Sequence, residues 1–438
     1  MFKKVLPLSA ILSLRFLGLF LVLPVISIYA MSMTDNMLLV GMVVGGYALT
    51  QAIFQVPFGA MSDKIGRKPT LLVGLVIFLV GSIISAYATD IYMLMLGRFL
   101  QGAGAIGSVI TAMISDVVEE EVRGKAMAIM GGFIALSFAV AMGLGPVIGA
   151  NYGIDTLFII TSVLAVLAMI LLFTKVPTPP KIKHIYHKTA KTTDILKDSN
   201  LLNMIIINAM QKGLMTVAFV IIPIILTSDA FAWERKDLYM AYLPAMIFGL
   251  VAMGPAAVFG EKHNKPKQIF LISIVLFIAS FLIMGLTTDS TTFIVGVVLF
   301  FVAFNMMEPL VQSMITKFAK VHQKGTALGI SNSVAYFATF IGGTLAGLAL
   351  EMSDRATIGI TVAVLATLWL LWTLKLQNPT KYKHLFIKED EVDLVKLEAL
   401  EHEHIAEWYI NETEKLVVIK YAVEAIEEET LKSTIIHE

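Results

Sequence analysis

The chain of 438 residues contains no cysteine, and only 15% of its residues are charged. Without cysteine, neither disulfides nor thiolate metal sites can form. Soluble domains carry about 25% charged residues, so this chain has too little charge to cover a soluble surface. The 33 Lys+Arg equal the 33 Asp+Glu, which excludes the basic excess of a nucleic-acid-binding protein. Apolar residues make up 57% of the chain, and a polytopic helical membrane protein is the class that remains.

Apolar segments are long and frequent enough to cross a lipid bilayer many times. A spanning helix needs about 20 mostly apolar residues. Twelve segments meet this need, at roughly 6–30, 38–61, 70–89, 91–115, 125–150, 154–175, 200–227, 238–260, 267–287, 291–316, 325–350 and 356–376. Most basic residues fall in one set of alternate loops, whereas the opposite loops hold Arg235, Lys236 and Arg355. The positive-inside rule therefore predicts a multi-pass protein with both termini in the cytoplasm.

The longest connection runs from Lys175 to Asn200, carries six lysines and divides six spans from six. An internal repeat supports this division, because the segment Gly59 to Pro69 after span two has a partial copy after span eight, Ala256 to Pro266. Repeats of the same orientation predict two parallel six-helix halves, residues 1–175 and 200–378, joined by a cytoplasmic linker at 176–199. Such an architecture holds its substrate near the midplane, between the halves.

The last segment, residues 383–438, differs from the rest in charge, with six Lys+Arg against 15 Asp+Glu. Its pattern predicts strands at 384–388, 404–410 and 415–421, helices at 389–401 and 423–431, and room for a last strand at 435–436. This order is typical of a small α+β, ferredoxin-like domain. Because the preceding chain is basic, we expect the tail to dock on the chain's own cytoplasmic face at low salt. The alternative is an independent domain whose acidic surface serves solubility.

Three motifs of defined spacing occur in the first half. The loop after span two reads Gly59-x-x-x-Asp63-Lys64-x-Gly66-Arg67-Lys68. Span four contains Leu94-x-x-x-Arg98-x-x-Gln101-Gly102-x-Gly104-Ala105, and span five contains Gly145-Pro146-x-x-Gly149 with Gly132 upstream. The first motif resembles the signature of the major facilitator superfamily, and the other two resemble motifs of its drug/proton antiporters.

Two further segments, Ser13 to Gly18 and Phe300 to Glu308, together with the short C-terminal domain, resemble the YajR-type transporters, which carry a ferredoxin-like YAM domain after span twelve. The resemblance covers essentially the whole chain. It implies a secondary active transporter in the cell inner membrane that works by alternating access and needs no cofactor. It further implies proton-coupled export of small, drug-like molecules. An importer or facilitator of a neutral or anionic solute is one alternative, and a membrane sensor whose tail recruits a partner is another.

The loop motif supplies candidates for a latch that holds the halves together on the cytoplasmic side. These residues are Gly59, Asp63, Gly66, Arg67, Lys68 and, at the end of span four, Asp116. A carboxylate is stabilised near a helix N-terminus, so we expect Asp63 to face the start of span eleven near Gly325. Arg67 is expected to pair with Asp116. The alternative is that the basic residues only fix the topology.

Four charged residues fall inside apolar spans, where each costs at least about 2.5 kcal/mol unless it faces the bundle interior or water. With polar neighbours they form a predicted cavity and coupling set: Arg15, Arg98, Gln51, Gln55, Lys212, Asn305 and Glu308. Glu308 is the one carboxylate in the interior of a predicted span, so it is the candidate proton carrier. The polar residues could instead join helices through buried hydrogen bonds.

Small residues and one proline in span five form a predicted helix-packing motif: Gly132, Gly145, Pro146 and Gly149. No Walker A pattern occurs in the sequence, so direct use of ATP is not expected. The sequence also shows no metal-ligand cluster and no nucleophile–base set, so we expect neither a metal nor enzymatic catalysis. The predicted partners are a small-molecule substrate, protons and the lipid bilayer, with no nucleic acid.

Overall fold

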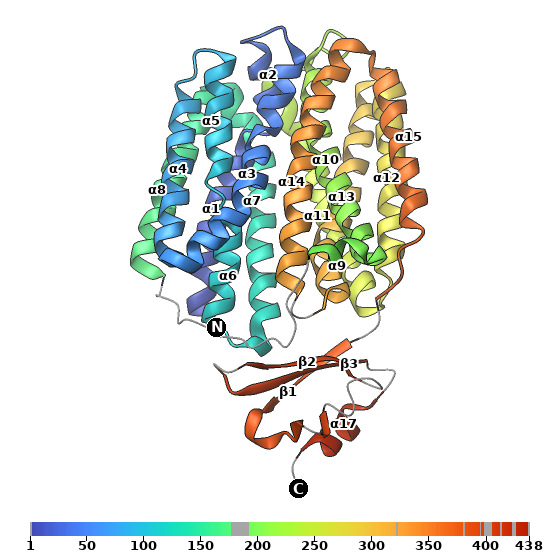
Figure 1. The fold of residues 1–438 in the computed structure, drawn as a ribbon. Helices are drawn as coiled ribbons and strands as arrows, with labels where there is room; N and C mark the ends of the chain where they lie inside the picture. Colours follow the sequence, from blue (N-terminus) through green and yellow to red (C-terminus); the bar gives the residue numbers. More distant parts are fainter. Residues whose placement is uncertain are drawn as a thin grey trace.

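The computed structural model describes residues 2–176, 192–320, 323–379, 382–394, 396–397, 405–411, 414–422 and 426–436. Within these residues, twelve helical segments are long and apolar enough to cross a membrane, which confirms the predicted number of spans. The spans form two bundles that stand side by side, with the small tail domain beneath them (Figure 1). The N-terminus lies at the same end of the molecule as the tail (Figure 1).

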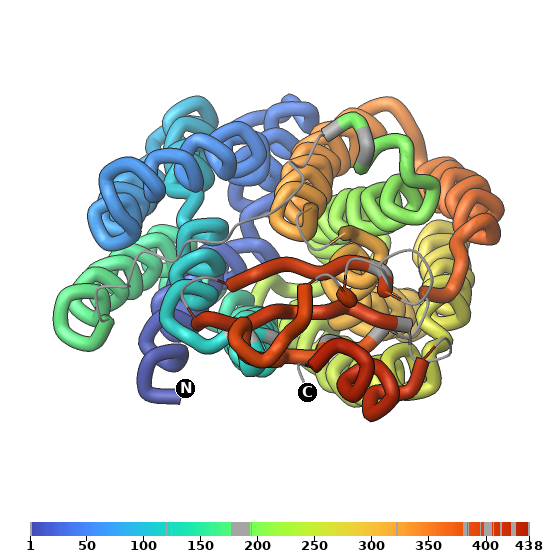
Figure 2. Tube along the Cα trace, turned by 60° about the horizontal axis from the view of Figure 1, so that its bottom comes forward, coloured from blue at the N-terminus to red at the C-terminus, as the bar shows by residue number. Residues whose placement is uncertain are grey.

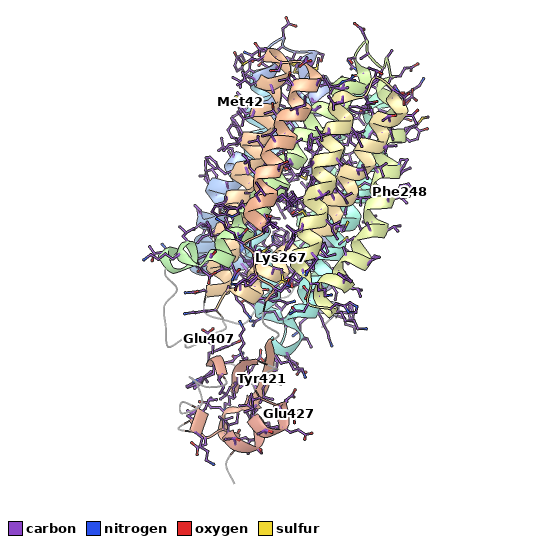
Figure 3. All side chains as sticks on the ribbon, turned by 90° about the vertical axis from the view of Figure 1, so that its right-hand side faces the viewer. Met42, Phe248, Lys267, Glu407, Tyr421 and Glu427 are labelled. Atoms are coloured by element: carbon purple, nitrogen blue, oxygen red, sulfur yellow. The ribbon has the colours of Figure 1, made fainter. Side chains whose placement is uncertain are left out.

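The helices of the first bundle are α1 (Phe2–Leu21), α2 (Ile26–Met31), α3 (Met37–Ile65), α4 (Arg67–Ala86), α5 (Ile91–Ala103), α6 (Gly107–Val117), α7 (Arg123–Tyr152) and α8 (Ile154–Lys175). A short helix, α9 (Thr192–Lys197), precedes the second bundle. That bundle contains α10 (Ser199–Thr227), α11 (Tyr239–Lys262), α12 (Pro266–Leu286), α13 (Ser290–Phe318), α14 (Lys324–Met352) and α15 (Arg355–Thr373). Apolar side chains such as Phe248, which is 57% exposed, cover the rim that faces lipid (Figure 3).

Two spans that the sequence predicts as single segments are broken helices. Span one consists of α1 and α2, which are separated around Pro24 because proline cannot continue the helical hydrogen bonding. Span four consists of α5 and α6, and the break lies at Gly104 to Ile106. Gly104 lies so close to α4 that an added Cβ would be 2.3 Å from Gly74 O. Broken helices in transporters expose backbone groups that can contact solutes.

The two bundles pack tightly at the end of the molecule away from the tail. A Cβ on Gly41 of α3 would lie 2.0 Å from the carbonyl oxygen of Gly343 in α14. A Cβ on Gly347 would lie equally close to Met37 O. Glycine is required at these positions because the backbones of the two helices touch. We call this contact between α3 and α14 the outer seal.

At the cytoplasmic ends, the glycines have free space instead. A Cβ added to Gly131 or Gly132 of α7, or to Gly325 or Gly329 of α14, would meet no atom within 4 Å. The same helix, α14, is therefore packed without space at one end and open at the other. This asymmetry identifies an inward-open conformation, with the halves joined on the outer side and apart on the cytoplasmic side.

The tail forms a three-stranded antiparallel sheet of β1 (Tyr382–Lys388), β2 (Ile405–Asn411) and β3 (Leu416–Ala422) in the order β1-β3-β2, followed by α17 (Glu428–Ile435). The predicted α+β class and the three strands are confirmed. The expected helix at 389–401 begins later, because Glu389–Glu391 form a 3-10 turn and the Asp393 side chain accepts a hydrogen bond from Lys396 N. The second helix begins at Glu428 rather than at 423, and the last strand is reduced to one bridge, Val392 to Ile436.

One face of this sheet packs on the tail's own core, and the other faces the membrane bundle (Figures 1 and 2). The bundle-facing side includes Lys420, which is buried and donates a hydrogen bond of 3.5 Å to Lys317 O at the end of α13. Burial and the nearby Lys324 lower the pKa of Lys420 to about 8. The described contact of the tail thus uses a lysine. The basic part of the linker at 177–191, to which the acidic tail could also dock, lies outside the described residues.

Docking of the tail should strengthen as the pH rises from about 8 towards 10.5. Lys420 has a pKa of about 8 in the docked domain, against an ordinary value of 10.5, so docking disfavours its protonated form. Below pH 8 Lys420 is protonated in both states, so docking bears the full free-energy cost of burying the charged amine. Above pH 10.5 the amine is neutral in both states, and this cost disappears. Fluorescence energy transfer between dyes on cysteines introduced at Ser433 and Ile65 should therefore increase over this interval. The variant Lys420→Met should lose that pH dependence, and an unchanged profile would contradict the assignment.

Candidate functional site

Arg15 lies on α1 inside the first bundle and is fully buried. Its Nη2 donates to Gln51 Oε1 at 3.3 Å and approaches Gln101 O at 3.5 Å. The guanidinium also lies over the rings of Phe16 and Phe78, with its carbon 5.6 and 5.4 Å from their centroids. Its Nε and Nη1 have no hydrogen-bond partner among the described residues. Arg15 is thus a buried cation with unused donors.

Arg98 of α5 is equally buried, but its donors are used within the protein. Its Nη1 donates to Gln101 Oε1 at 2.7 Å, and its Nε and Nη2 donate to the backbone oxygens of Val43 and Val44. The guanidinium lies over Tyr47, 4.8 Å from the ring centroid. These contacts tie α5 to α3. They favour the interpretation of Arg98 as a residue that joins helices rather than one that binds a solute.

In the second bundle, Lys212 of α10 and Glu308 of α13 form an ion pair. Lys212 Nζ lies 2.9 and 2.8 Å from the two carboxylate oxygens, and Gln211 Nε2 donates to Oε2 at 3.0 Å. Although both residues lie well inside their spans, 25% and 38% of their side-chain surfaces are exposed. Lys212 Nζ lies 4.8 Å from the ring centroid of Phe304, and that ring lies 6.0 Å from Phe138 of the first bundle, so the pair is on the side of its bundle that faces the other half.

The remaining members of the predicted cavity set differ in their surroundings. Gln51 is buried beside Arg15, from which its Oε1 accepts a hydrogen bond. Gln55, one turn further on, accepts a hydrogen bond from Ser108 Oγ on its backbone oxygen, whereas its Oε1 is unpartnered. Asn305 lies elsewhere: its amide donates to Phe301 O on the same helix and packs against Gly249 of α11. The structure thus engages the Asn305 amide with its own helix and with α11, and its role as a cavity residue stays a prediction.

Sequence reasoning missed Tyr336 of α14. It is close enough to Arg15 and Glu308 to interact electrostatically with both, and its hydroxyl interacts with Gln51. A lone tyrosine in an apolar span gives no signal of this position. The pairing of Lys212 with Glu308 was also missed, although an intramembrane acid and a base in neighbouring spans are obvious partners.

The predicted latch residues are only partly together. Arg67 Nε donates to Asp116 Oδ2 at 2.8 Å, which is the expected pair, and its Nη1 donates to Asp63 Oδ1 at 2.6 Å. The expected contact of Asp63 with the start of α14 is not formed. The Asp63 side chain is 68% exposed and is held by Arg67, while the space around Gly325 is empty. Lys68 has no hydrogen-bond or ion-pair partner among the described residues.

Two glycines of the loop motif have different roles. Gly66 has φ +100°, a conformation that other residues rarely adopt, and it allows α4 to start directly after α3. Gly59 makes no close helix contact in the present conformation, because a Cβ added to it would lie 4.0 Å from the nearest atom, Ser108 Oγ.

The span-five motif divides between the two ends of α7. At the outer end, a Cβ on Gly145 would lie 2.3 Å from Leu21 O, and one on Gly149 would lie 3.2 Å from Val25. Pro146 lies between them within the helix. The packing role predicted for these residues is therefore visible at the outer end, whereas Gly132, near the cytoplasmic end, touches no neighbour.

The Arg67–Asp116 pair should show energetic coupling. Both side chains are more than four-fifths buried, so removing one partner leaves a mostly buried charge alone. We expect the variants Arg67→Gln and Asp116→Asn each to lower the free energy of unfolding. The loss in the double variant should be smaller than the sum of the two single losses by about 0.5–3 kcal/mol. Unfolding in detergent, compared across the four proteins, measures this difference. Additive losses would show that the pair contributes nothing.

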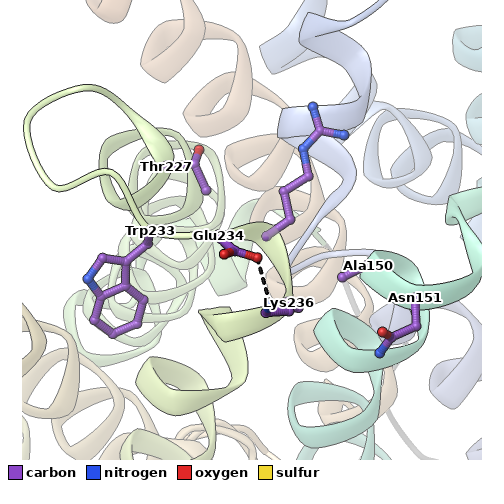
Figure 4. A pocket seen from close by; sticks show the side chains of 7 residues that line it. Ala150, Asn151, Thr227, Trp233, Glu234 and Lys236 are labelled. Atoms are coloured by element: carbon purple, nitrogen blue, oxygen red, sulfur yellow. Dashed lines mark ion pairs between the residues drawn. The ribbon is translucent and has the colours of Figure 1, made fainter.

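A shallow depression lies on the outer side, above the sealed halves (Figure 4). It is lined by residues of α7, α10 and the loop between α10 and α11, among them Asn151 and Trp233. Lys236 and Glu234 form an exposed ion pair of 2.7 Å at its edge. It does not include any of the interior charges, so the candidate transport site remains the interior set around Arg15, Gln51, Tyr336, Lys212 and Glu308.

Known proteins resemble this chain over almost all of its length. The profile of the Major Facilitator Superfamily matches residues 8–265 and 204–419. Inner membrane transport protein YajR of Escherichia coli is 34% identical over 424 residues, covering 94% of this chain and 92% of that protein. Quinolone resistance protein NorA of Staphylococcus aureus is 24% identical, and the match covers 80% of this chain and 91% of that protein.

The crystal structure of a D-xylose-proton symporter superimposes on this structure with a TM-score of 0.69 at 14% identity. The match covers 85% of this chain and 98% of the symporter chain. At this identity the likeness concerns the fold alone. Twelve spans, the profile match and a relative that is alignable from end to end agree with one another. The chain belongs to the Major Facilitator Superfamily of transporters.

Proposed function

We propose that the protein is a proton-coupled exporter of small molecules in the inner membrane that works by alternating access. The observation that carries this proposal is the Lys212–Glu308 ion pair, which is partly exposed inside an inward-open bundle. A carboxylate in that position can exchange protons with the cytoplasm in this conformation. The relatives support the direction and the location, since one is named an inner membrane transport protein and another a quinolone resistance protein.

Coupling would follow from the competition between a proton and Lys212 for Glu308. In the inward-open state the carboxylate is paired with Lys212 and with Gln211. Protonation from the outer side would neutralise Glu308 and leave Lys212 without its partner. The net charge of the interior would then differ between the protonated and deprotonated states. Such a difference can shift the equilibrium between the inward-open and outward-open conformations, because protonation then stabilises the two conformations unequally.

The latch would act on the other side of the cycle. We propose that Asp63, already positioned by Arg67 and Asp116, reaches the first turn of α14 when the cytoplasmic ends close. Gly131 and Gly132 of α7 would then supply the close packing there that Gly41 and Gly343 supply at the outer seal. The two halves, residues 1–175 and 200–378, would move largely as rigid bodies.

Transport into proteoliposomes with an imposed pH gradient tests the proposal. Pooled candidate solutes are offered on one side, and accumulation is compared between an acidic and a neutral opposite compartment. Accumulation against a gradient, driven by protons moving the other way, is the expected result. Movement of solute together with protons would support an importer. A tail that binds partners while no solute moves under any gradient would support a sensor.

A further inference from the structure

The break in span four brings several unused hydrogen-bond donors together. The chain turns at Gly104 to Ile106, where Ala105 N bonds to Ala103 O and Ile106 N bonds to Gly104 O. The first turn of α6 therefore begins with N–H groups that have no intrahelical acceptor. A Cβ on Gly107, the first residue of this 11-residue helix, would meet nothing within 4 Å, so the helix start borders on open space.

Arg15 is directed at the same break. Its Nη2 lies 3.5 Å from Gln101 O, in the last turn of α5, and its Nε and Nη1 are fully buried without a partner. Gln51 lies beside it, with Oε1 accepting from Arg15 and its side chain also reaching the Tyr336 hydroxyl. Buried donors that lack acceptors are costly, and several together indicate an acceptor that binds there. Guanidinium, amide and helix N–H groups together match a carboxylate.

The charges inside the spans favour the same class of ligand. Arg15, Arg98 and Lys212 are cations, and Glu308 is the one carboxylate among the described residues of the span interiors. The first bundle holds two buried arginines and, within its described interior, no acid to compensate them. A cationic solute would add to this excess, whereas an anion would reduce it.

Aromatic rings run from Arg15 towards the second bundle. Phe16 stacks on Phe20 at 5.3 Å, and Phe20 meets Phe138 of α7 edge to face at 4.9 Å. Phe138 in turn lies 6.0 Å from Phe304 of α13, whose ring is 4.8 Å from Lys212 Nζ. An acid group held at Arg15 would therefore have an aromatic surface beside it on which an apolar or aromatic body could lie.

We propose that the broken span four and Arg15 form an acid-binding subsite, and that the exported solute is an organic anion with an apolar or aromatic body. This inference rests on the proposed function, because it names the substrate class of the same site. The carboxylate would replace Gln51 Oε1, a weak acceptor at 3.3 Å from Arg15 Nη2, and would accept a second hydrogen bond from Nε or from Nη1. Arg98 serves as the internal comparison, since its donors are all engaged.

Three probes of one shape and different charge test the subsite: 1-naphthoate, 1-naphthylmethylammonium and 1-naphthalenemethanol. Stabilisation of the purified full chain against thermal unfolding in detergent reports binding of each probe. We expect wild-type protein to bind naphthoate at least about tenfold more tightly than either of the others, because charge-assisted bonds favour the acid. Equal or tighter binding of the ammonium probe would overturn the proposal without the use of any variant.

Two variants then locate the site. Arg15→Gln should lose at least about tenfold in affinity for naphthoate, while Arg98→Gln, which removes the same charge from engaged donors, should lose less than about threefold. The affinity of Arg15→Lys for naphthoate should lie between those of the two glutamine variants, because lysine keeps the charge but not the planar guanidinium. This variant also keeps the test valid if Arg15→Gln does not fold. Equal losses of naphthoate affinity in Arg15→Gln and Arg98→Gln would overturn the proposal that the acid binds at the unpartnered donors of Arg15. Proton-driven transport of the ammonium probe would overturn the substrate class while leaving the proposed function intact.

Discussion

Replacing Glu308 by glutamine should reduce solute transport driven by a pH gradient by at least about tenfold. Intramembrane acids are the usual proton carriers, and the other carboxylates of the described spans lie near the span ends. Glutamine keeps the shape of the side chain and can still accept a bond from Gln211, but it cannot exchange a proton and no longer compensates Lys212. Solute exchange without a gradient should be affected much less. Accumulation and exchange are measured in the same proteoliposomes.

A second carboxylate provides the matched control for this change. Glu261 at the end of α11 also pairs with a lysine of α13, Lys317, but it lies at the cytoplasmic edge of the bundle. Glu261→Gln removes the same charge from the same type of pair and should leave proton-driven accumulation close to that of the wild type. If Glu308→Gln reduces accumulation and exchange equally, Glu308 has a structural role and coupling resides elsewhere.

Replacing Gly41 by leucine should prevent the outer side from closing. Even a single Cβ would lie 2.0 Å from Gly343 O, which is backbone and cannot move aside as a side chain can. Overpacking of this kind costs about 1–3 kcal/mol, which shifts an equilibrium by about tenfold to a hundredfold. Because the clash exists only in the sealed state, the variant should remain folded but populate the inward-open state much less, and its transport rate should fall accordingly.

The neighbouring residue on α3 is the control for the leucine variant. Met42 lies at the edge of the bundle (Figure 3) and takes no part in the contact between Gly41 and Gly343. Met42→Leu should therefore transport at a rate close to that of the wild type. If Gly41→Leu transports normally, the contact between α3 and α14 is not a seal that the cycle needs.

The number of spans, their division and the class of the tail could be predicted from the sequence because each follows from local composition. Twenty apolar residues can only be a span, and a basic loop indicates its side. The pairing of Arg67 with Asp116 was also accessible, because the family motif places Arg67 and the end of span four carries Asp116. These features depend on one segment at a time or on a known pattern.

The contacts between spans and the conformational state could not be predicted from the sequence in the same way. Tyr336 belongs to the site because α14 brings it near Arg15 and Glu308, and nothing in its own segment indicates this. Asn305 resembles a cavity residue in sequence, yet its amide bonds to its own helix and packs on Gly249. The expected contact of Asp63 with α14 belongs to another conformation, and a single sequence does not specify which conformation is populated.

The central claim is that the outer seal and the cytoplasmic opening occur together and are lost together when the cytoplasmic side closes. It can be measured directly because the chain has no native cysteine. Spin labels at Asp35 and Ser353 report the outer ends of α3 and α14, and labels at Ile65 and Lys320 report the cytoplasmic side. In the Gly41→Leu background, the account predicts that the outer distance lengthens and the cytoplasmic distance shortens relative to the wild type. An outer distance that lengthens while the cytoplasmic distance stays unchanged would contradict it.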